Sequence, residues 1–324
     1  MKLKNFLTLS ALATIISFGN THAANSINQN GSLLVTLDAN NSATFVTTFP
    51  NRFSFIVSNG PLACEDGTYT QVETYWPDGT SLIEGFCDVI HIRAAGLSGT
   101  NTLALGAVQA RGLTIPGTLD IRGGGDDDTV AFGSNVSVGK AILTLRGGNN
   151  RVRGAANSFS PMSIGPFNFT AVTSGSFSVN TTLDIDTNNG DDIVNFRALT
   201  VGGTADINVG GGDDKVNIYG GGGTNSFNKV ILRLGNGDNK GSIRNTICHL
   251  CQVFGGGGSD DIFLGGVTAG IDVDVIAGGS DDTVELNNVT SGIDVNANGG
   301  AGDDCLIDNG NSATTVNNFE GCTL

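Results

Sequence analysis

Basic side chains and histidines are scarce in this chain of 324 residues, which has 16 Lys and Arg against 31 Asp and Glu, and only 3 His. The formal net charge of −15 argues against nucleic acid or anionic lipid as a partner, because an acidic surface repels both and attracts cations. The lysines and histidines beyond residue 23 are Lys140, Lys215, Lys229, Lys240, His91 and His249. A catalytic base of either type is therefore rare, and we expect no nucleic-acid partner.

A long apolar run is also missing, since the stretch from Phe6 to Phe18 is shorter than the about 20 residues that cross a bilayer. Lys2 and Lys4 precede this stretch, and Thr21 and Ala23 supply the small residues of a cleavage site. This pattern is typical of a Sec signal peptide over residues 1–23. We therefore expect an exported chain without a transmembrane segment after processing, located in the periplasm, at the cell surface or outside the cell.

The composition excludes two further classes of protein. Charged residues make up 15% and hydrophobic residues 39% of the chain, which is too apolar for an acidic disordered segment. The 49 glycines do not recur at every third position, which excludes collagen. The many Val, Ile, Thr and Asn residues favour strands and turns, so we expect an all-β fold.

The 6 cysteines suit an exported protein, which meets an oxidising compartment. Cys64 lies close to Cys87 in the sequence, and Cys305 lies close to Cys322, so we expect two local disulfides. Cys248 and Cys251 form a CHLC motif without the helical pattern that a redox site needs. This last pair is interpreted either as a structural bridge or as two buried thiols.

A glycine-rich turn followed by acidic residues recurs along the chain, as in GGGDDKVNI and GGAGDDCLI. Aligning these turns on the second acidic position predicts spacings near 22 residues, with one of 42 that we interpret as two periods. Counting from Asp88, the pattern predicts eleven units ending at Asp304. The aligned positions are Asp128, Asn150, Asp192, Asp214, Asn239, Asp261, Asp282 and Asp304.

Apolar residues alternate within each unit, as at Val284 and Leu286, which indicates strands with one buried face. A unit of about 22 residues cannot bury its own apolar face, so neighbouring units must stack. The sequence therefore predicts a right-handed parallel β-helix over residues 88–307. Residues 24–87 are interpreted as a β-rich N-terminal cap and residues 308–324 as a C-terminal cap, because a solenoid must cover its ends.

In-register coils place the carboxylates of Asp261, Asp282 and Asp304 above one another along one edge of the solenoid. At a coil spacing of about 4.8 Å, two unit charges repel by about 0.9 kcal/mol in water and about 3.5 kcal/mol at an effective dielectric constant of 20. Either solvent screens this ladder, or divalent cations bind between the carboxylates of adjacent turns, with carbonyl oxygens completing the shell.

The stretch from Gly299 to Ile307 resembles the nonapeptide of the RTX, or haemolysin-type, calcium-binding repeats, through Gly299, Gly300, Gly302, Asp304 and Leu306. The resemblance implies that Ca²⁺ binds between successive turns through Asp304 and the carbonyl of a turn glycine such as Gly302. It implies the same role, on weaker matches, for Asp192, Asp214, Asp261 and Asp282. The family repeats every nine residues, whereas this motif recurs about every 22, so it can occupy one edge only.

More broadly, the chain resembles exported bacterial proteins that are built from such coils and are not dedicated enzymes. A catalytic site is needed only once in a chain and should therefore interrupt the repeat, whereas the carboxylates of this chain follow the repeat. The sequence therefore favours a non-catalytic solenoid with a structural, adhesive or matrix-associated role, with carbohydrate or another cell-surface component as partner. The alternative is a β-helix polysaccharide lyase or hydrolase, because many parallel β-helices are such enzymes.

Overall fold

The computed structural model describes the side chains of residues 115–132, 136–154, 176–220, 223–312, 314–320 and 322. For residues before 115, and for residues 162–169, it describes only the backbones of strands. The expected signal peptide, residues 1–23, lies outside the described residues. No helix in the described part of the chain is long and apolar enough to cross a membrane.

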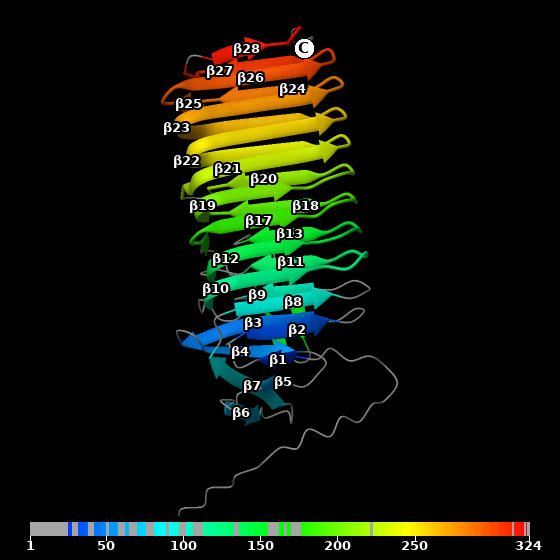
Figure 1. Ribbon diagram of the computed structural model, residues 1–324, viewed down its shortest axis with the longest axis vertical. Coiled ribbons are helices and arrows are strands. Elements are labelled where there is room, and N and C mark those ends of the chain that lie inside the picture. Colours follow the sequence, from blue (N-terminus) through cyan, green and yellow to red (C-terminus); the bar gives the residue numbers. More distant parts are fainter. Residues whose placement is uncertain are drawn as a thin grey trace, which may run out of the picture.

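Parallel strands stack into a solenoid of about 8 turns, in agreement with the all-β parallel fold that the sequence predicts (Figure 1). Each coil contributes one strand to each of two long sheets and a short segment to a third side. The first sheet contains β2 (Ser32–Leu37), β8 (His91–Gly96), β10 (Leu113–Arg122), β12 (Val136–Thr144), β17 (Thr182–Asp186), β19 (Leu199–Asn208), β21 (Asn225–Asn236), β22 (Lys240–Gly257), β23 (Asp261–Gly279), β26 (Asp294–Ala301) and β28 (Thr314–Asn317).

The second sheet begins after the glycine-rich turn of each coil, and its strands are short until β22 and β23, which run around the corner between sheets. It contains β3 (Ser42–Phe49), β9 (Thr102–Leu105), β11 (Thr129–Phe132), β13 (Arg151–Gly154), β18 (Ile193–Arg197), β20 (Lys215–Tyr219), the starts of β22 and β23, β24 (Thr283–Asn287) and β27 (Cys305–Asn309). The third side pairs β16 (Phe177–Val179) and β25 (Thr290–Ser291) with parts of the longer strands.

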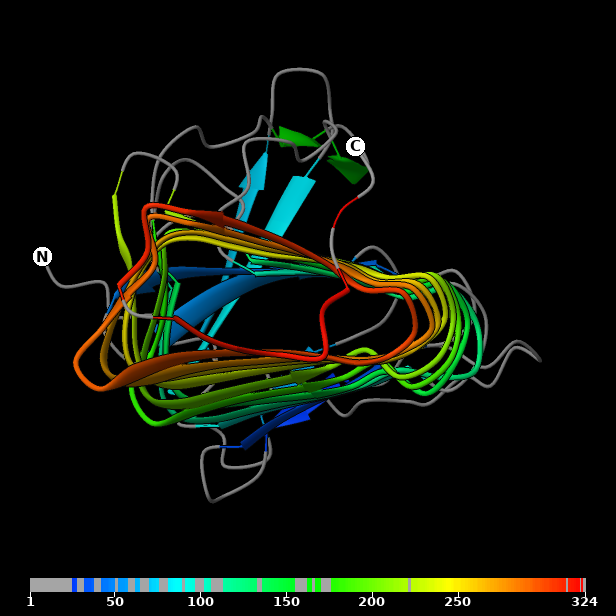
Figure 2. The same ribbon diagram turned by 90° about the horizontal axis from the view of Figure 1, so that it is seen from above.

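Alternation along the strands builds one continuous core inside the coils, which Figure 2 shows stacked above one another along the axis of the solenoid. In β20, for example, Val216 and Ile218 are buried while Lys215, Asn217 and Tyr219 point outward. The register places equivalent residues of successive coils above one another, so apolar ladders run along the axis. One ladder contains Val152, Val194, Val216, Gly241, Ile262 and Val284.

The 42-residue spacing is a single coil with an insertion, so the predicted count of eleven units is wrong. Arg151 pairs directly with Ile193, and the backbone N–H of Asn150 donates to Asp192, which leaves no room for a coil between them. The insertion between β13 and β16 contains the antiparallel pair β14 (Met162–Ile164) and β15 (Phe167–Phe169). Sequence spacing alone cannot distinguish one coil with a long loop from two coils.

The unit predicted between Asp88 and Asp128 is also absent, because β8 pairs directly with β10 and β9 pairs directly with β11. Asp88 itself ends β7 (Ser81–Asp88), where it pairs with Arg52 in an antiparallel arrangement. Parallel stacking nevertheless reaches further toward the N-terminus, since β2 pairs with β8 and β3 pairs with β9. Parallel stacking therefore begins at β2 and β3, whereas the repeated turn is first recognisable in the sequence at Asp128.

Antiparallel strands accompany the first coils. β4 (Arg52–Val57) pairs with β3 and β7, β6 (Thr70–Tyr75) pairs with β7, and β1 (Asn25–Ile27) pairs antiparallel with β2 and parallel with β5 (Leu62–Cys64). Cys64 ends β5 and Cys87 lies in β7. The disulfide expected between them falls outside the residues whose side chains are described.

At the C-terminal end, the chain folds back over the last coil. Cys305 and Cys322 form the disulfide that the sequence predicts, and Phe319 packs against the core. The Glu320 carboxylate accepts a hydrogen bond from the backbone N–H of Asp304 at 3.4 Å, and the Asp304 carbonyl accepts one from the Glu320 N–H at 3.2 Å. Glu320 thus supplies the acceptor that a further coil would otherwise provide.

Candidate functional site

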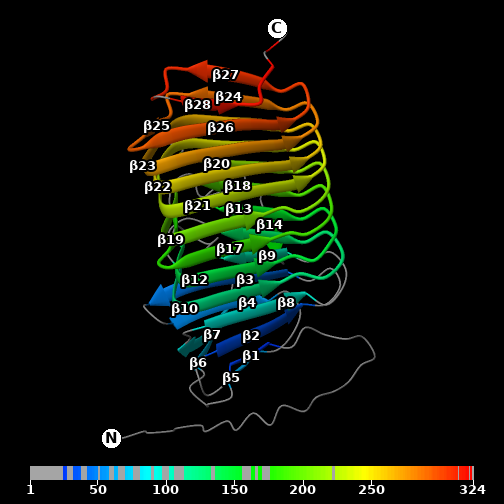
Figure 3. The ribbon, with the colours of Figure 1, turned by 45° about the horizontal axis from the view of Figure 1, so that its top comes forward.

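The glycine-rich turns stack on one side of the solenoid, between the first and second sheets (Figure 3). Positive φ angles at Gly212, Gly237 and Gly302 make each turn tight enough to repeat in register with the next. A Cβ atom on Gly302 would overlap the carbonyl oxygen of Ser280 on the preceding coil, so only glycine fits there. These turns position the two columns of polar side chains that form the candidate site.

The inner column is buried inside the turns. Its residues are at most 3% exposed, and the Oδ1 atom of each member after Asp128 accepts a hydrogen bond from the backbone N–H of the inner residue on the preceding coil, at 2.6 to 3.0 Å. The side chains therefore link each coil by a hydrogen bond to the coil before it. The members of the inner column are Asp128, Asn150, Asp192, Asp214, Asn239, Asp260, Asp282 and Asp304.

The outer column lies one residue earlier in each turn and is exposed to solvent. Here the hydrogen bonds run in the opposite direction, because in six of the turns the side-chain Oδ1 atom accepts from the backbone N–H of the outer residue on the following coil, at 2.7 to 2.9 Å. The members of the outer column are Asp127, Asn149, Asp191, Asp213, Asp238, Ser259, Asp281 and Asp303. The paired acids of the sequence therefore have separate structural roles.

Asp261 is not a member of either column, so the sequence alignment is wrong by one residue at this turn. Asp260 occupies the inner position, and Ser259 occupies the outer position. Asp261 instead starts β23, in register with Lys240 and Thr283, and its exposed carboxylate pairs with the Lys240 ammonium at 2.7 Å. The turn has the same length as the next one, since Gly256 and Gly278 are in register and each lies four residues before the inner aspartate. Serine occupies the outer position here, so aligning on the second acid selects Asp261 instead of Asp260.

The second carboxylate oxygen separates the aspartates from the asparagines of the inner column. The Nδ2 atom of Asn239 donates to the Gly237 carbonyl at 2.9 Å, and Nδ2 of Asn150 donates to the Gly148 carbonyl at 3.1 Å. At the equivalent place, five aspartates present a buried Oδ2 atom that has no hydrogen-bond partner among the described residues. They are Asp192, Asp214, Asp260, Asp282 and Asp304.

Burial dominates the electrostatics of these carboxyls. It raises the pKa of Asp192, Asp260 and Asp282 to about 6 and that of Asp214 to about 7, even though the hydrogen bonds they accept favour the charged form. Neighbouring acids add to the rise, for example Asp192 acting on Asp214. A proton, a water molecule or a cation beside Oδ2 would take the place of the amide N–H that asparagine supplies.

The carboxylate and backbone carbonyl oxygens of these turns are ligands that suit a hard cation such as Ca²⁺, which binds carboxylate, carbonyl and water oxygens. Of the residues predicted to bind metal, Asp192, Asp214, Asp282 and Asp304 share the inner column, and Gly302 holds the turn position equivalent to Gly237. No group of three or more His, Cys, Asp or Glu side chains converges on one point within the described ranges. Backbone carbonyls and water would therefore have to supply most of the shell.

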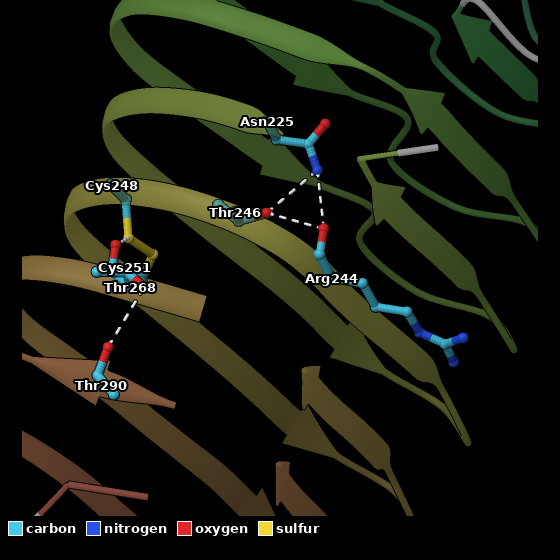
Figure 4. The surroundings of a disulfide bond; sticks show 7 residues. All are labelled: Asn225, Arg244, Thr246, Cys248, Cys251, Thr268 and Thr290. Atoms are coloured by element: carbon cyan, nitrogen blue, oxygen red, sulfur yellow. Dashed lines mark hydrogen bonds between the residues drawn. A yellow bond between two sulfur atoms is a disulfide. The ribbon is translucent and has the colours of Figure 1, made fainter. Parts of the chain in front are cut away.

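Sequence reasoning missed a second polar corner, where the chain passes from the second sheet to the third side (Figure 4). Asn225 is fully buried, accepts a hydrogen bond from the Leu199 N–H and donates to the Arg244 carbonyl and the Thr246 hydroxyl. Asn311 accepts from the Val289 N–H in the same manner. Single asparagines among Leu, Thr and Val carry no repeat that a sequence could reveal.

Cys248 and Cys251 form a disulfide next to this corner, which decides between the two interpretations left open by the sequence (Figure 4). Both residues lie inside the long strand β22 and are at most 2% exposed. The bridge joins the third side to the first sheet within one coil. It therefore fixes the bend of β22 locally.

Comparison with known proteins adds no family to these observations. No family model, no curated protein and no solved structure matches the chain.

Proposed function

We propose that this chain is an exported, non-catalytic β-solenoid whose stacked aspartate turns bind calcium. The observation that carries the proposal is the set of five buried carboxylate oxygens, one in each of five glycine-rich turns, without a hydrogen-bond partner among the described residues. A cation there would satisfy these oxygens and offset the repulsion between carboxylates of neighbouring coils. Asn150 and Asn239 close their own turns with amide donors, so the proposed sites are confined to the aspartate turns.

The periodicity of the site favours a structural role over catalysis. Each inner aspartate has the same Oδ1 bond, the same turn and the same burial as its neighbours on other coils. A catalytic centre requires one location that differs from the repeat, whereas a cation that stabilises coil stacking is useful in every coil. We therefore propose a rigid surface or matrix rod with an adhesive or structural role, stabilised by Ca²⁺ after export.

The test is thermal unfolding of the full chain in EDTA, in millimolar CaCl₂ and in millimolar MgCl₂ at one ionic strength. A ligand at a hundredfold excess over its Kd stabilises by about 2.7 kcal/mol per site if it binds only the folded state. We expect the melting temperature to rise selectively with Ca²⁺. Asp282→Asn and Asp304→Asn should each reduce this rise, since the amide N–H fills the place of the cation.

Asp281→Asn is the matched control, because Asp281 is the exposed outer neighbour of Asp282 and should keep the calcium response. An equal rise with Mg²⁺, or with NaCl of the same ionic strength, that survives Asp282→Asn would show general screening. The calcium proposal would then be rejected, and protonated carboxyls would remain as the explanation of the inner column.

A further inference from the structure

Positive charge in this acidic protein is concentrated on the outward face of the second sheet. The outward positions of β13, β18, β20 and the start of β22 contain no Asp or Glu. They contain six of the 16 Lys and Arg residues of the chain, namely Arg151, Arg153, Arg197, Lys215, Lys240 and Arg244. Outward acids of this sheet appear on the next two coils, at Asp261 of β23 and Glu285 of β24.

The first sheet carries both signs of charge at its outward positions over the same coils, where Asp184, Asp186 and Asp206 are opposed by Lys140, Lys229 and Arg233. Asp184 and Asp206 are adjacent in register, and Asp274 continues the same column further along the axis. Partial burial, followed by the charges of Asp206 and Asp186, raises the pKa of Asp184. Arg233 also pairs with Asp206, so the first sheet has no net charge at these outward positions, whereas the second sheet is positive over the same coils.

The register spaces the basic groups along the axis of the rod. Arg151, Ile193, Lys215 and Lys240 form one outward column, in which successive positions are separated by the strand spacing of about 4.8 Å. Asp261 ends this column and pairs with Lys240. Arg151 and Lys215 are exposed, and they would face successive charges of a linear ligand lying along the axis.

Arg244 is held in a fixed orientation on this face. Its Nε atom donates to the Ser242 hydroxyl at 2.9 Å, and its guanidinium carbon lies 4.4 Å from the centroid of the Phe263 ring. No described residue accepts a hydrogen bond from its Nη atoms. A guanidinium fixed in this manner loses little conformational entropy on binding, and its planar N–H groups match the two oxygens of a carboxylate.

We propose that this basic face, defined by Arg151, Lys215, Lys240 and Arg244, binds an acidic polysaccharide whose carboxylates lie along the rod axis. Charge complementarity selects an anionic ligand, and basic groups stacked along the rod axis suit a linear polymer with repeated carboxylates. A nucleic acid has a higher charge density and would be repelled more strongly by the acidic remainder of the molecule. The inference names a partner for the proposed surface role but does not depend on calcium.

The experiment measures binding of the full chain to polygalacturonate in EDTA at low ionic strength, by calorimetry or co-sedimentation, with dextran as the uncharged polymer. We expect binding to polygalacturonate, none to dextran, and an affinity that falls as salt is added. Lys215→Gln with Arg244→Gln should weaken binding at least tenfold. Lys140→Gln with Lys229→Gln changes the net charge equally on the first sheet and should weaken it less than twofold.

Three results would overturn the proposal: no binding of polygalacturonate by the wild type in EDTA, an equal loss in both double variants, or tighter binding to single-stranded DNA through the same residues. The last result would reassign the face to nucleic acid. Because EDTA is present throughout, these results leave the calcium proposal untouched. Circular dichroism of each variant at the binding temperature verifies that the solenoid is folded.

Discussion

The inner and outer columns of the aspartate turns differ in burial and in the direction of their bonds, although their residues are neighbours in sequence. Asp214 is fully buried and accepts the backbone N–H of Asp192 on the preceding coil, whereas Asp213 is exposed and is the acceptor for Asp238 on the following coil. A pair of adjacent acids thus links its coil to both neighbours. The same chemical group carries a large desolvation cost in one column and almost none in the other.

The comparison also explains which residues replace aspartate in each column. Asparagine appears in the inner column at Asn150 and Asn239, where its amide supplies a donor toward the turn carbonyls. The outer column accepts both Asn149 and Ser259, because water can complete its hydrogen bonds. Burial therefore makes a charged inner carboxylate unfavourable unless it is protonated or bound to a cation. The outer carboxylates are hydrated and do not carry this cost.

The largest expected effect is the pH dependence of stability in EDTA. The pKa of the inner aspartates is raised in the folded state to about 6 or 7, so their protonated form stabilises the fold below about pH 4, and this contribution is lost as the pH rises through 6 to 7. Each pKa unit corresponds to about 1.4 kcal/mol. We expect the urea midpoint to be several-tenths molar or more higher at pH 5 than at pH 8.

Calcium should flatten this pH profile, because the cation would take the place of the proton at pH 8. Asp214→Asn should remove part of the slope, and Asp213→Asn, the exposed neighbour, should leave it intact. A midpoint that stays constant or rises from pH 5 to pH 8 in EDTA would contradict the account of the inner column.

The next largest effect should come from the turn that supports both columns. Gly212 has a φ of 129°, and a Cβ atom there would overlap the Gly190 carbonyl of the preceding coil, so Gly212→Ala should cost about 2 to 4 kcal/mol. Gly211 has room for a Cβ atom, with the Asn189 side chain as its nearest neighbour at 3.2 Å. Gly211→Ala should cost less than about 1 kcal/mol. Equal unfolding free energies for the two variants would mean that the turn can relax.

Removing one acceptor from each column isolates the effect of burial. Asp214→Ala leaves the buried N–H of Asp192 without a partner and should cost about 1 to 3 kcal/mol at pH 5. Asp213→Ala exposes the Asp238 N–H to water and should cost less than about 0.5 kcal/mol. Urea unfolding measures both. A larger decrease in the free energy of unfolding for Asp213→Ala than for Asp214→Ala would contradict the view that the inner column contributes more to stability.

The smallest effect sharpens the contrast between amide and acid within the inner column. Asn239→Asp replaces the donor to the Gly237 carbonyl with an oxygen and should destabilise by about 1 to 2 kcal/mol at pH 8, with recovery at pH 5. The outer change Asp238→Asn should be nearly neutral at both values. If Asn239→Asp were tolerated at pH 8 in EDTA, the carbonyl would not require a donor.

The sequence by itself determined the parallel solenoid, because apolar alternation and a period near 22 can be satisfied only when coils stack in register. It also located the turns containing Asp192, Asp214, Asp282 and Asp304, and the bond between Cys305 and Cys322. Recurrence shows which residues are equivalent. Where the repeat is regular, equivalent residues are also neighbours in space.

Only the tertiary structure decided the inward position of Asp260 over Asp261, the single coil across the 42-residue spacing, and the basic face. A shift of one residue exchanges the inside and outside of a strand, and adjacent identical residues hide that shift in the sequence. Insertions add length without adding a coil. Arg151, Lys215 and Lys240 each directly follow an inner-column residue, and they form one face with Arg244 because the register places β13, β18, β20 and β22 side by side.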